Sequence, residues 1–279
     1  MTEPLPNPNA IDPDGSAAMA ALAALDDHAL ARALAEEAGT MLVSLRARLV
    51  ADGMVGRTLA EAGDRAAHEL LMTRLAHVRP DDEILSEEGS GTEGPAGRSR
   101  LTSDRVWIVD PLDGSREFGE PSRPDWAVHV ALVTAGSPVA GAVALPAQRR
   151  ILGTSPAAPT PPAPPARPRL IVSRTRPPAV ARYLAEVLGG DLVPMGSAGA
   201  KAAAVVLGAA DIYAHAGGQY EWDSCAPAAV ARAAGVWASR LDGSPLIYNN
   251  ADPYLPDLLI CHPLLVDQVH QAIATYLAR

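Results

Sequence analysis

The chain has 279 residues, of which 48% are hydrophobic, so it is long enough for one large hydrophobic core or two smaller ones. Its 32 acidic and 23 basic residues give a net charge of −9, and without a run of basic residues this balance argues against a nucleic-acid polymer as the partner. No apolar run reaches the roughly 18 residues that a membrane-spanning helix needs, so no membrane contact is expected.

The start of the chain is polar and rich in proline, and it lacks the basic residues with which a signal peptide begins. Residues 1–17 are therefore expected to be a disordered lead-in. The two cysteines, Cys225 and Cys261, do not have the spacing of a metal site. We expect them to be buried free thiols, and we expect a cytoplasmic location.

Residues 18–155 are predicted to combine helices and strands. Apolar residues at three- and four-residue spacing from Leu22 to Leu49 predict one long amphipathic helix that begins at Asp26 or slightly earlier. A second helix is expected from about Asp64 to His77. Strands are expected at Glu83–Ser86, Arg105–Asp110, Ala127–Val133, Val139–Leu145 and Arg150–Thr154, with the third and fourth joined as a hairpin.

Residues 156–168 are so rich in proline that they predict a stiff, extended connector without a function of its own. After it, in residues 169–279, strands and helices alternate. Strands are expected at Leu170–Ser173, Asp191–Met195, Asp211–His215, Val236–Arg240 and Leu258–Cys261. Helices are expected at Pro177–Leu188, Ala198–Leu207, Asp223–Ala234 and Pro263–Leu277. An α+β half followed by an α/β half predicts stacked layers of helices and sheets.

The most informative stretch of the chain runs from Trp107 to Ser115 and reads WIVDPLDGS. Its apolar beginning predicts a buried strand, and the chain is expected to turn at Pro111, which has no N–H for the sheet. Asp110 and Asp113 then lie together where the strand ends. Two carboxylates about 4 Å apart repel each other by about 4 kcal/mol at an effective dielectric constant near 20, so a divalent cation is expected between them.

Three further acidic residues lie at boundaries of predicted elements. Asp64 is expected to open a helix, Glu87 follows a predicted strand, and Asp223 is expected at a helix start. Each has a simpler interpretation, as a helix cap or as part of a solvated loop. If they converge with the other two, however, they form a site for a pair of Mg²⁺ or Mn²⁺ ions, which provide the means to hydrolyse a phosphoester.

The string Asp110-Pro-Leu-Asp-Gly-Ser115, with Ser86-Glu-Glu88 before it and Glu221-Trp-Asp223 after it, resembles the lithium-sensitive, Mg²⁺-dependent inositol monophosphatase superfamily. The resemblance covers nearly the whole chain from about residue 20 and implies a five-layer α-β-α-β-α sandwich. Gly196-Ser-Ala-Gly-Ala-Lys201 and Leu241-Asp-Gly-Ser-Pro-Leu246 are most similar to the 3′(2′),5′-bisphosphate nucleotidases of sulfate assimilation. Those enzymes remove the 3′-phosphate of adenosine 3′,5′-bisphosphate to leave AMP.

The resemblance also implies a set of metal ligands. Glu87, Asp110 and the carbonyl oxygen of Leu112 would hold a first Mg²⁺ ion. Asp110, Asp113 and Asp223 would hold a second one. A third, weaker ion or the attacking water would lie near Asp64, the remaining acidic residue of the set.

By the same resemblance, Asp64, Glu87 and Ser115 would take part in catalysis by metal-activated water. Ser115 stands where the family usually has threonine, and its hydroxyl would orient the water with Asp64 or Glu87. The substrate would contact Gly114, Ser115, Arg176, Gly196, Ser197, Ala198, Lys201 and His215. Arg116 either positions the phosphate or pairs with Glu117 on a surface helix.

Three positions depart from the nucleotidase pattern: Arg176 replaces a histidine, His215 an arginine and Ala198 a serine. The first two substitutions either exchange roles around a second phosphate or indicate a smaller sugar phosphate. Inositol 1-phosphate and fructose 1,6-bisphosphate are therefore alternative substrates, within one class of small phosphate monoester partners. A non-catalytic metal or nucleotide sensor is a further alternative, because Ser115 replaces the usual threonine. The family contains both monomers and dimers, so the resemblance is compatible with a homodimer.

Overall fold

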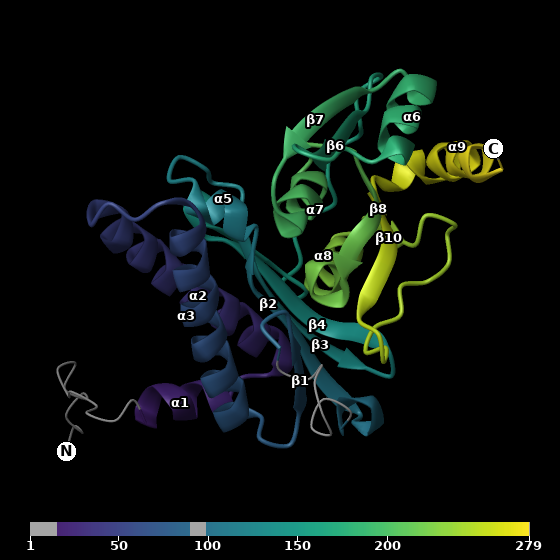
Figure 1. Cartoon of the computed structure of the whole chain (residues 1–279). Helices are drawn as coiled ribbons and strands as arrows, with labels where there is room; N and C mark the ends of the chain where they lie inside the picture. Colours follow the sequence, from purple (N-terminus) through teal and green to yellow (C-terminus); the bar gives the residue numbers. More distant parts are fainter. Residues whose placement is uncertain (1–15, 90–98, 279) are drawn as a thin grey trace, which may run out of the picture.

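The computed structural model describes residues 16–89 and 99–278, which form two five-stranded sheets with helices outside and between them (Figure 1). This is the predicted five-layer α-β-α-β-α arrangement. Of the expected lead-in, residues 1–15 lie outside the described residues, and Ser16 and Ala17 already belong to the first helix, α1 (Ser16–Ala23). The lead-in prediction was therefore wrong at its last two residues.

The first sheet is covered on its outer side by two long helices, α2 (Asp27–Ala51) and α3 (Gly56–Val78), on which α1 packs. Its strand order is β1-β2-β3-β4-β5, and only the β1–β2 pair is parallel. The strands are β1 (Glu83–Ser86), β2 (Arg105–Asp113), β3 (Ala127–Thr134), β4 (Ser137–Leu145) and β5 (Arg150–Gly153). A short helix, α5 (Ser115–Gly119), follows β2.

The second sheet has the strand order β7-β6-β8-β10-β9. Its strands are β6 (Arg169–Ser173), β7 (Asp191–Met195), β8 (Ile212–Tyr220), β9 (Trp237–Ser239) and β10 (Tyr254–Cys261). Helices α7 (Ala198–Val206) and α8 (Glu221–Ala233) lie between the two sheets, and α6 (Ala179–Leu188) and α9 (Val266–Leu277) lie on the far side (Figure 1).

The main hydrophobic core is shared by both sheets and by the helices between them. It includes Val106 and Ile108 of β2, Tyr213 of β8, Val230 of α8 and Ile260 of β10. Residues 156–168 contain neither helix nor strand, as expected, and they join β5 to β6. The division of the chain into two halves at this connector stays a prediction.

Helix α2 begins where the sequence indicates, because the side chain of Asp26 caps it by accepting a 2.8 Å hydrogen bond from the N–H of Ala29. Helix α3, however, begins eight residues earlier than expected, so Asp64 lies inside it and the prediction that Asp64 opens a helix was wrong. Gly63 does not end a helix here. A Cβ at Gly63 would lie 2.7 Å from the ring of Phe118 and 2.8 Å from Leu112, so glycine allows α3 to pack closely.

The predicted turn at Pro111 was also wrong. Strand β2 continues to Asp113, and its pairing with β3 is irregular between Asp110 and Asp113. Such a bulge leaves a residue unpaired, so the missing N–H of Pro111 costs no ladder hydrogen bond. Similarly, β8 extends beyond His215 to Tyr220. No helix among the described residues is long and apolar enough to cross a membrane.

Candidate active site

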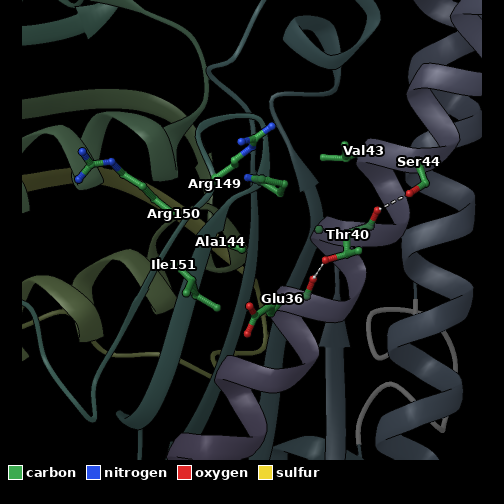
Figure 2. Close-up of a pocket in the computed structure, with 10 residues that line it drawn as sticks. Glu36, Thr40, Val43, Ser44, Ala144, Arg149, Arg150 and Ile151 are labelled. Atoms are coloured by element: carbon green, nitrogen blue, oxygen red, sulfur yellow. Dashed lines mark hydrogen bonds between the residues drawn. The ribbon is translucent and has the colours of Figure 1, made fainter.

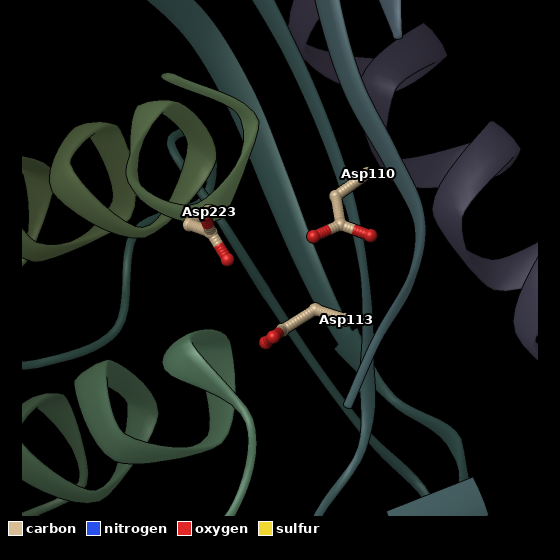
Figure 3. A group of neighbouring side chains, drawn as sticks. All are labelled: Asp110, Asp113 and Asp223. Carbon is tan, nitrogen blue, oxygen red and sulfur yellow. The ribbon is translucent and has the colours of Figure 1, made fainter. Parts of the chain in front are cut away.

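Three aspartates from two distant segments meet at the end of β2 (Figure 3). Asp110 and Asp113 lie at the bulged end of this strand, and Asp223 lies in the first turn of α8. Each offers one carboxylate oxygen, and these three oxygens lie within 4.8 Å of one another. Asp110 and Asp113 are buried, so their negative charges are poorly screened by water.

Two more acidic side chains complete the group. Glu87 follows β1 and shares a hydrogen bond with the carboxyl group of Asp110, which requires a proton on one of the two. Asp64 projects from α3 and forms a hydrogen bond with the side chain of Ser115. The structure therefore brings the five acidic residues together. That they bind metal and take part in catalysis stays a prediction.

The pKa values of these carboxyl groups report this crowding. Burial raises the pKa of Asp110 well above its ordinary value, and the charges of Glu87 and Asp113 raise it further. Glu87 keeps exposed surface, but loss of water around its carboxyl group and the charges of the neighbouring aspartates raise its pKa to about 8. Burial and Glu88 raise that of Asp64 to about 7, and burial and Asp113 raise that of Asp223 to about 6.

Asp113 differs from the others because it is surrounded by donors. It accepts hydrogen bonds from the hydroxyl of Ser197 and from the N–H groups of Ala198 (2.9 Å) and Gly199 (2.6 Å). His129 lies beside it, with Nε2 3.3 Å from Asp113 Oδ2. Burial raises the pKa of Asp113, but His129 and these other groups outweigh it and hold the pKa below its ordinary value.

This donor set fits a hard divalent cation. Carboxylate oxygens are the ligands that Mg²⁺ prefers, and a cation among them would remove the repulsion that raises the pKa values of Asp110 and Glu87. The buried backbone of Leu112 lies next to them, and its N–H donates a 3.1 Å hydrogen bond to Asp110 Oδ1. That the Leu112 carbonyl binds the metal stays a prediction.

We expect Mg²⁺ to raise the unfolding temperature more at pH 8 than at pH 6. Unfolded carboxyl groups have pKa values near 4, so between about pH 4 and pH 8 the folded, metal-free protein holds protons that the unfolded chain has released. The stability contributed by Glu87 and Asp64 is therefore complete below about pH 4 and is lost as the pH rises through about 7 to 8. Mg²⁺ displaces these protons and removes the repulsion.

Thermal unfolding in EDTA, in Mg²⁺ and in NaCl of equal ionic strength checks this expectation. Equal Mg²⁺-induced shifts at the two pH values would contradict it.

Several residues expected to bind substrate surround the acidic group. Gly114 has a left-handed backbone conformation (φ 85°) and starts α5, where Ser115 is the first residue. A Cβ at Gly114 would lie 3.0 Å from the Cβ of Ser197, so the turn after β2 and the start of α7 are in close contact. Gly196 donates a 2.7 Å hydrogen bond to Asp125 Oδ2. The structure thus brings Gly114, Ser115 and residues 196–198 together beside the aspartates.

The basic residues expected to bind substrate have different surroundings. Lys201 is buried, and its Nζ donates to the carbonyls of Gly196 (3.2 Å) and Ser197 (2.5 Å). His215 lies near the exposed Arg176; burial, with the charges of Lys201 and Arg176, lowers its pKa.

Arg116 is exposed, and its Nε lies 3.8 Å from Glu120 Oε1, so its ion-pair partner is Glu120 and not Glu117. That Arg116 positions the phosphate stays a prediction.

Sequence reasoning missed two buried groups next to the site. Glu117 is buried and accepts a 2.8 Å hydrogen bond from Arg174, which links α5 to the loop after β6. His129 is fully buried in β3 beside Asp113. For His129 a signal was present, since it is the one ionisable residue in the apolar run Ala127–Val133. For the Glu117–Arg174 pair we see no such signal.

The first residue of the Glu221-Trp-Asp223 motif has a separate role. Glu221 is fully buried, and its carboxylate accepts hydrogen bonds from the N–H groups of Asn249 (2.6 Å) and Asn250 (2.8 Å). Arg100 donates a 2.7 Å hydrogen bond to Asn249 Oδ1. The N–H of Tyr248 donates to the Gly136 carbonyl (3.0 Å). The motif therefore holds the loop after β9 at the start of α8, as well as supplying Asp223, and the loop itself contacts the first sheet through Tyr248.

A cavity of about 340 Å³ lies elsewhere, between α2 and the β4–β5 connection (Figure 2). Two of its hydroxyl groups are already used, because Thr40 and Ser44 donate to the carbonyls of Glu36 (2.8 Å) and Thr40 (3.1 Å). None of the five acidic residues lines it. We therefore place the functional site at the aspartates and not in this cavity.

Comparisons with known proteins identify relatives of this chain. The chain is 50% identical over 250 residues to the 3′-phosphoadenosine 5′-phosphate phosphatase of Mycobacterium tuberculosis, covering 85% of this chain and 90% of the relative. It is 31% identical over 205 residues to the 3′(2′),5′-bisphosphate nucleotidase CysQ of Escherichia coli, covering 70% and 81%. The fold of inositol monophosphatase II from Staphylococcus aureus matches with a TM-score of 0.72 and 19% identity, covering 90% and 97%.

The model of the inositol monophosphatase family matches residues 25–158 and 166–274, which is most of the chain. The matched residues include all five acidic side chains of the site. The sequence, the layered fold and the cluster of carboxylates lead to the same conclusion: this chain belongs to the inositol monophosphatase family.

Proposed function

We propose that the chain is a Mg²⁺-dependent phosphatase that hydrolyses the 3′-phosphate of adenosine 3′,5′-bisphosphate to give AMP and phosphate. The observation that carries this proposal is the meeting of Asp110, Asp113 and Asp223, with carboxylate oxygens within 4.8 Å of one another. The choice of substrate is supported by the names of the two relatives, one of them 50% identical over 250 residues.

Glu87, Asp110, Asp113 and Asp223, with the Leu112 carbonyl, would hold two Mg²⁺ ions. Bound there, the ions would offset the charge of the phosphate and lower the pKa of a water molecule.

Two side chains would act on the attacking water. Asp64 and the hydroxyl of Ser115, joined by a hydrogen bond, orient the attacking water, and a pKa near 7 suits Asp64 to accept its proton. A third Mg²⁺ ion would lie near Asp64.

The second half of the chain contacts the alcohol part of the substrate. Gly196, Ser197 and Ala198 lie beside Asp113 and face the sugar. Arg176 would supply positive charge for a second phosphate, and His215, whose pKa is lowered in the free protein, would gain a proton when that phosphate binds beside it. Lys201 holds the backbone at residues 196–197 through hydrogen bonds to their carbonyl oxygens, and it adds a positive charge near the site.

A smaller sugar phosphate is the second candidate substrate. The observation in its favour is that Lys201 already donates two hydrogen bonds to backbone carbonyls, which leaves it less able to bind a second phosphate directly. Inositol 1-phosphate, which has a single phosphate, represents this class. Fructose 1,6-bisphosphate, which has two phosphates, remains an alternative substrate that this observation does not favour.

Phosphate release from these three substrates, in Mg²⁺ and in EDTA, tests the proposal. We expect adenosine 3′,5′-bisphosphate to give at least about a tenfold higher kcat/KM than the others, since one additional well-placed charged contact is worth more than about 1.4 kcal/mol. AMP is the control, because it has a 5′-phosphate and no 3′-phosphate. Nucleotide binding without phosphate release would contradict the proposal and indicate a sensor.

A further inference from the structure

His129 occupies a position between the elements that carry the predicted metal ligands. It lies in β3 and is fully buried. The end of β2, with Asp113, lies on one side of its ring, and the start of α8, with Trp222, lies on another. Trp222 directly precedes Asp223.

Each ring nitrogen of His129 faces an acceptor. Nδ1 lies 3.0 Å from the carbonyl oxygen of Trp222, which can only accept a hydrogen bond, so Nδ1–H donates to it. Nε2 lies 3.3 Å from Asp113 Oδ2, within ion-pair distance, but without the geometry of a hydrogen bond. Nδ1 is also 3.9 Å from Asp110 Oδ2. One side chain therefore links β2 to the first turn of α8.

The start of α7 closes the remaining side of the ring. A Cβ on Gly199 would overlap His129 Nε2, so only glycine at this position leaves room for the imidazole. The N–H of Gly199 in turn donates a 2.6 Å hydrogen bond to Asp113 Oδ2. The ring is thus confined between three elements and has little room to move away from Asp113.

We propose that His129 is a positioning residue that sets the separation of the Asp113 and Asp223 carboxylates. This inference rests on the proposed function, in which both residues bind the second metal ion. The α7 N–H groups orient Asp113, and the N–H of Tyr220 orients Asp223 by a 2.7 Å hydrogen bond. The His129 ring connects these two arrangements, because it contacts Asp113 on one side and the carbonyl of the residue before Asp223 on the other.

The competing interpretation is that His129 only fills the core. In that case His129→Leu changes stability, because the buried Asp113 carboxylate loses a partner, but the folded variant binds metal as wild type does. If His129 is a positioning residue, the folded variant also holds the metal ligands at the wrong separation and binds metal more weakly. Metal affinity in a folded variant therefore distinguishes the two interpretations.

Three variants test separately the contact of the ring with Asp113 and its contact with the Trp222 carbonyl. The amide nitrogen of glutamine in His129→Gln reaches about as far as Nε2 and keeps a donor toward Asp113. That of asparagine in His129→Asn reaches about as far as Nδ1 and keeps a donor toward the Trp222 carbonyl. His129→Leu keeps neither. His77→Leu, at an exposed position on α3, is the matched control.

The experiment measures Mn²⁺ binding by calorimetry and thermal unfolding of the metal-free protein. We expect His129→Leu to bind Mn²⁺ about 10–100-fold more weakly than wild type, the range found for groups that orient metal ligands. The Mn²⁺ affinities of His129→Gln and His129→Asn should lie between those of wild type and His129→Leu. The metal-free unfolding temperature of His129→Leu should lie below that of wild type, because the buried Asp113 carboxylate loses a partner. His77→Leu should bind Mn²⁺ as wild type does.

Wild-type Mn²⁺ affinity in His129→Leu would overturn the positioning role and leave the proposed function intact. If His129→Leu does not fold, the two amide variants decide, and wild-type affinity in both would overturn the role. Unfolding of all three variants would also overturn it, since His129 would then be a stability element. Absence of Mn²⁺ binding by the wild type would instead refute the metal site on which the proposed function rests.

Discussion

Asp110→Asn is expected to lower the rate of phosphate release by roughly 10³-fold, because charge stabilisation by bound metal is worth several kcal/mol and each 1.36 kcal/mol is a factor of ten in rate. Asparagine has the shape of aspartate but no negative charge, and Asp110 is the carboxylate that both predicted metal ions share. The measurement is kcat in saturating Mg²⁺, with Mn²⁺ affinity as a second observable.

The same substitution should raise the stability of the metal-free protein. Burial and the neighbouring carboxylates raise the pKa of Asp110, so its negative charge is unfavourable in the folded state. Thermal unfolding in EDTA should therefore give a higher midpoint for Asp110→Asn than for wild type. Asp104→Asn is the matched control, since Asp104 is exposed just before the same strand. Near-normal turnover of Asp110→Asn would refute the metal assignment.

Asp64→Asn is expected to lower kcat by roughly 10²–10³-fold with little change in KM, which is the contribution of a positioned general base. Asp64 is half-buried on α3 and is hydrogen-bonded to Ser115, whereas Glu69, further along the same helix, is exposed. Glu69→Gln therefore removes a carboxylate from the same helix away from the site, and its kcat should match that of wild type.

A double-mutant cycle extends this test to Ser115. If Asp64 and Ser115 orient one water together, Asp64→Asn and Ser115→Ala should each remove most of their joint contribution, and the double variant should be little worse than either. Ser115→Thr keeps the hydroxyl and should remain active. Additive losses in the double variant would show that the two side chains act independently.

The strands and most helices could be predicted from the sequence because their signals are local. Alternating or continuous apolar residues gave β1 and β7 with the bounds that the structure has, and the cap at Asp26 marked the start of α2. The errors came where a glycine or proline serves tertiary packing. Gly63 lets α3 approach Phe118, and the bulge around Pro111 lets β2 continue, and neither partner is visible in the local sequence.

The acidic residues could be predicted as a group because carboxylates next to buried strands repel one another and need a positive charge nearby, wherever they lie in the fold. The groups that orient these acidic residues could not be predicted from the sequence. Asp113 is oriented by N–H groups about 85 residues further along the chain, and backbone donors leave no trace in a sequence. Arg174 and Glu117, 57 residues apart, look like ordinary surface charges until the fold brings them together.

Helix α8 lies between the sheets and packs on both of them, while its first turn carries Asp223 (Figure 1). Cutting the chain at the proline-rich connector would leave the inner face of the first sheet in water and would take away one of the five carboxylates. Neither of the two fragments would then contain all five carboxylates. The two pieces joined by the connector therefore depend on each other, because each supplies carboxylates that the proposed metal site needs.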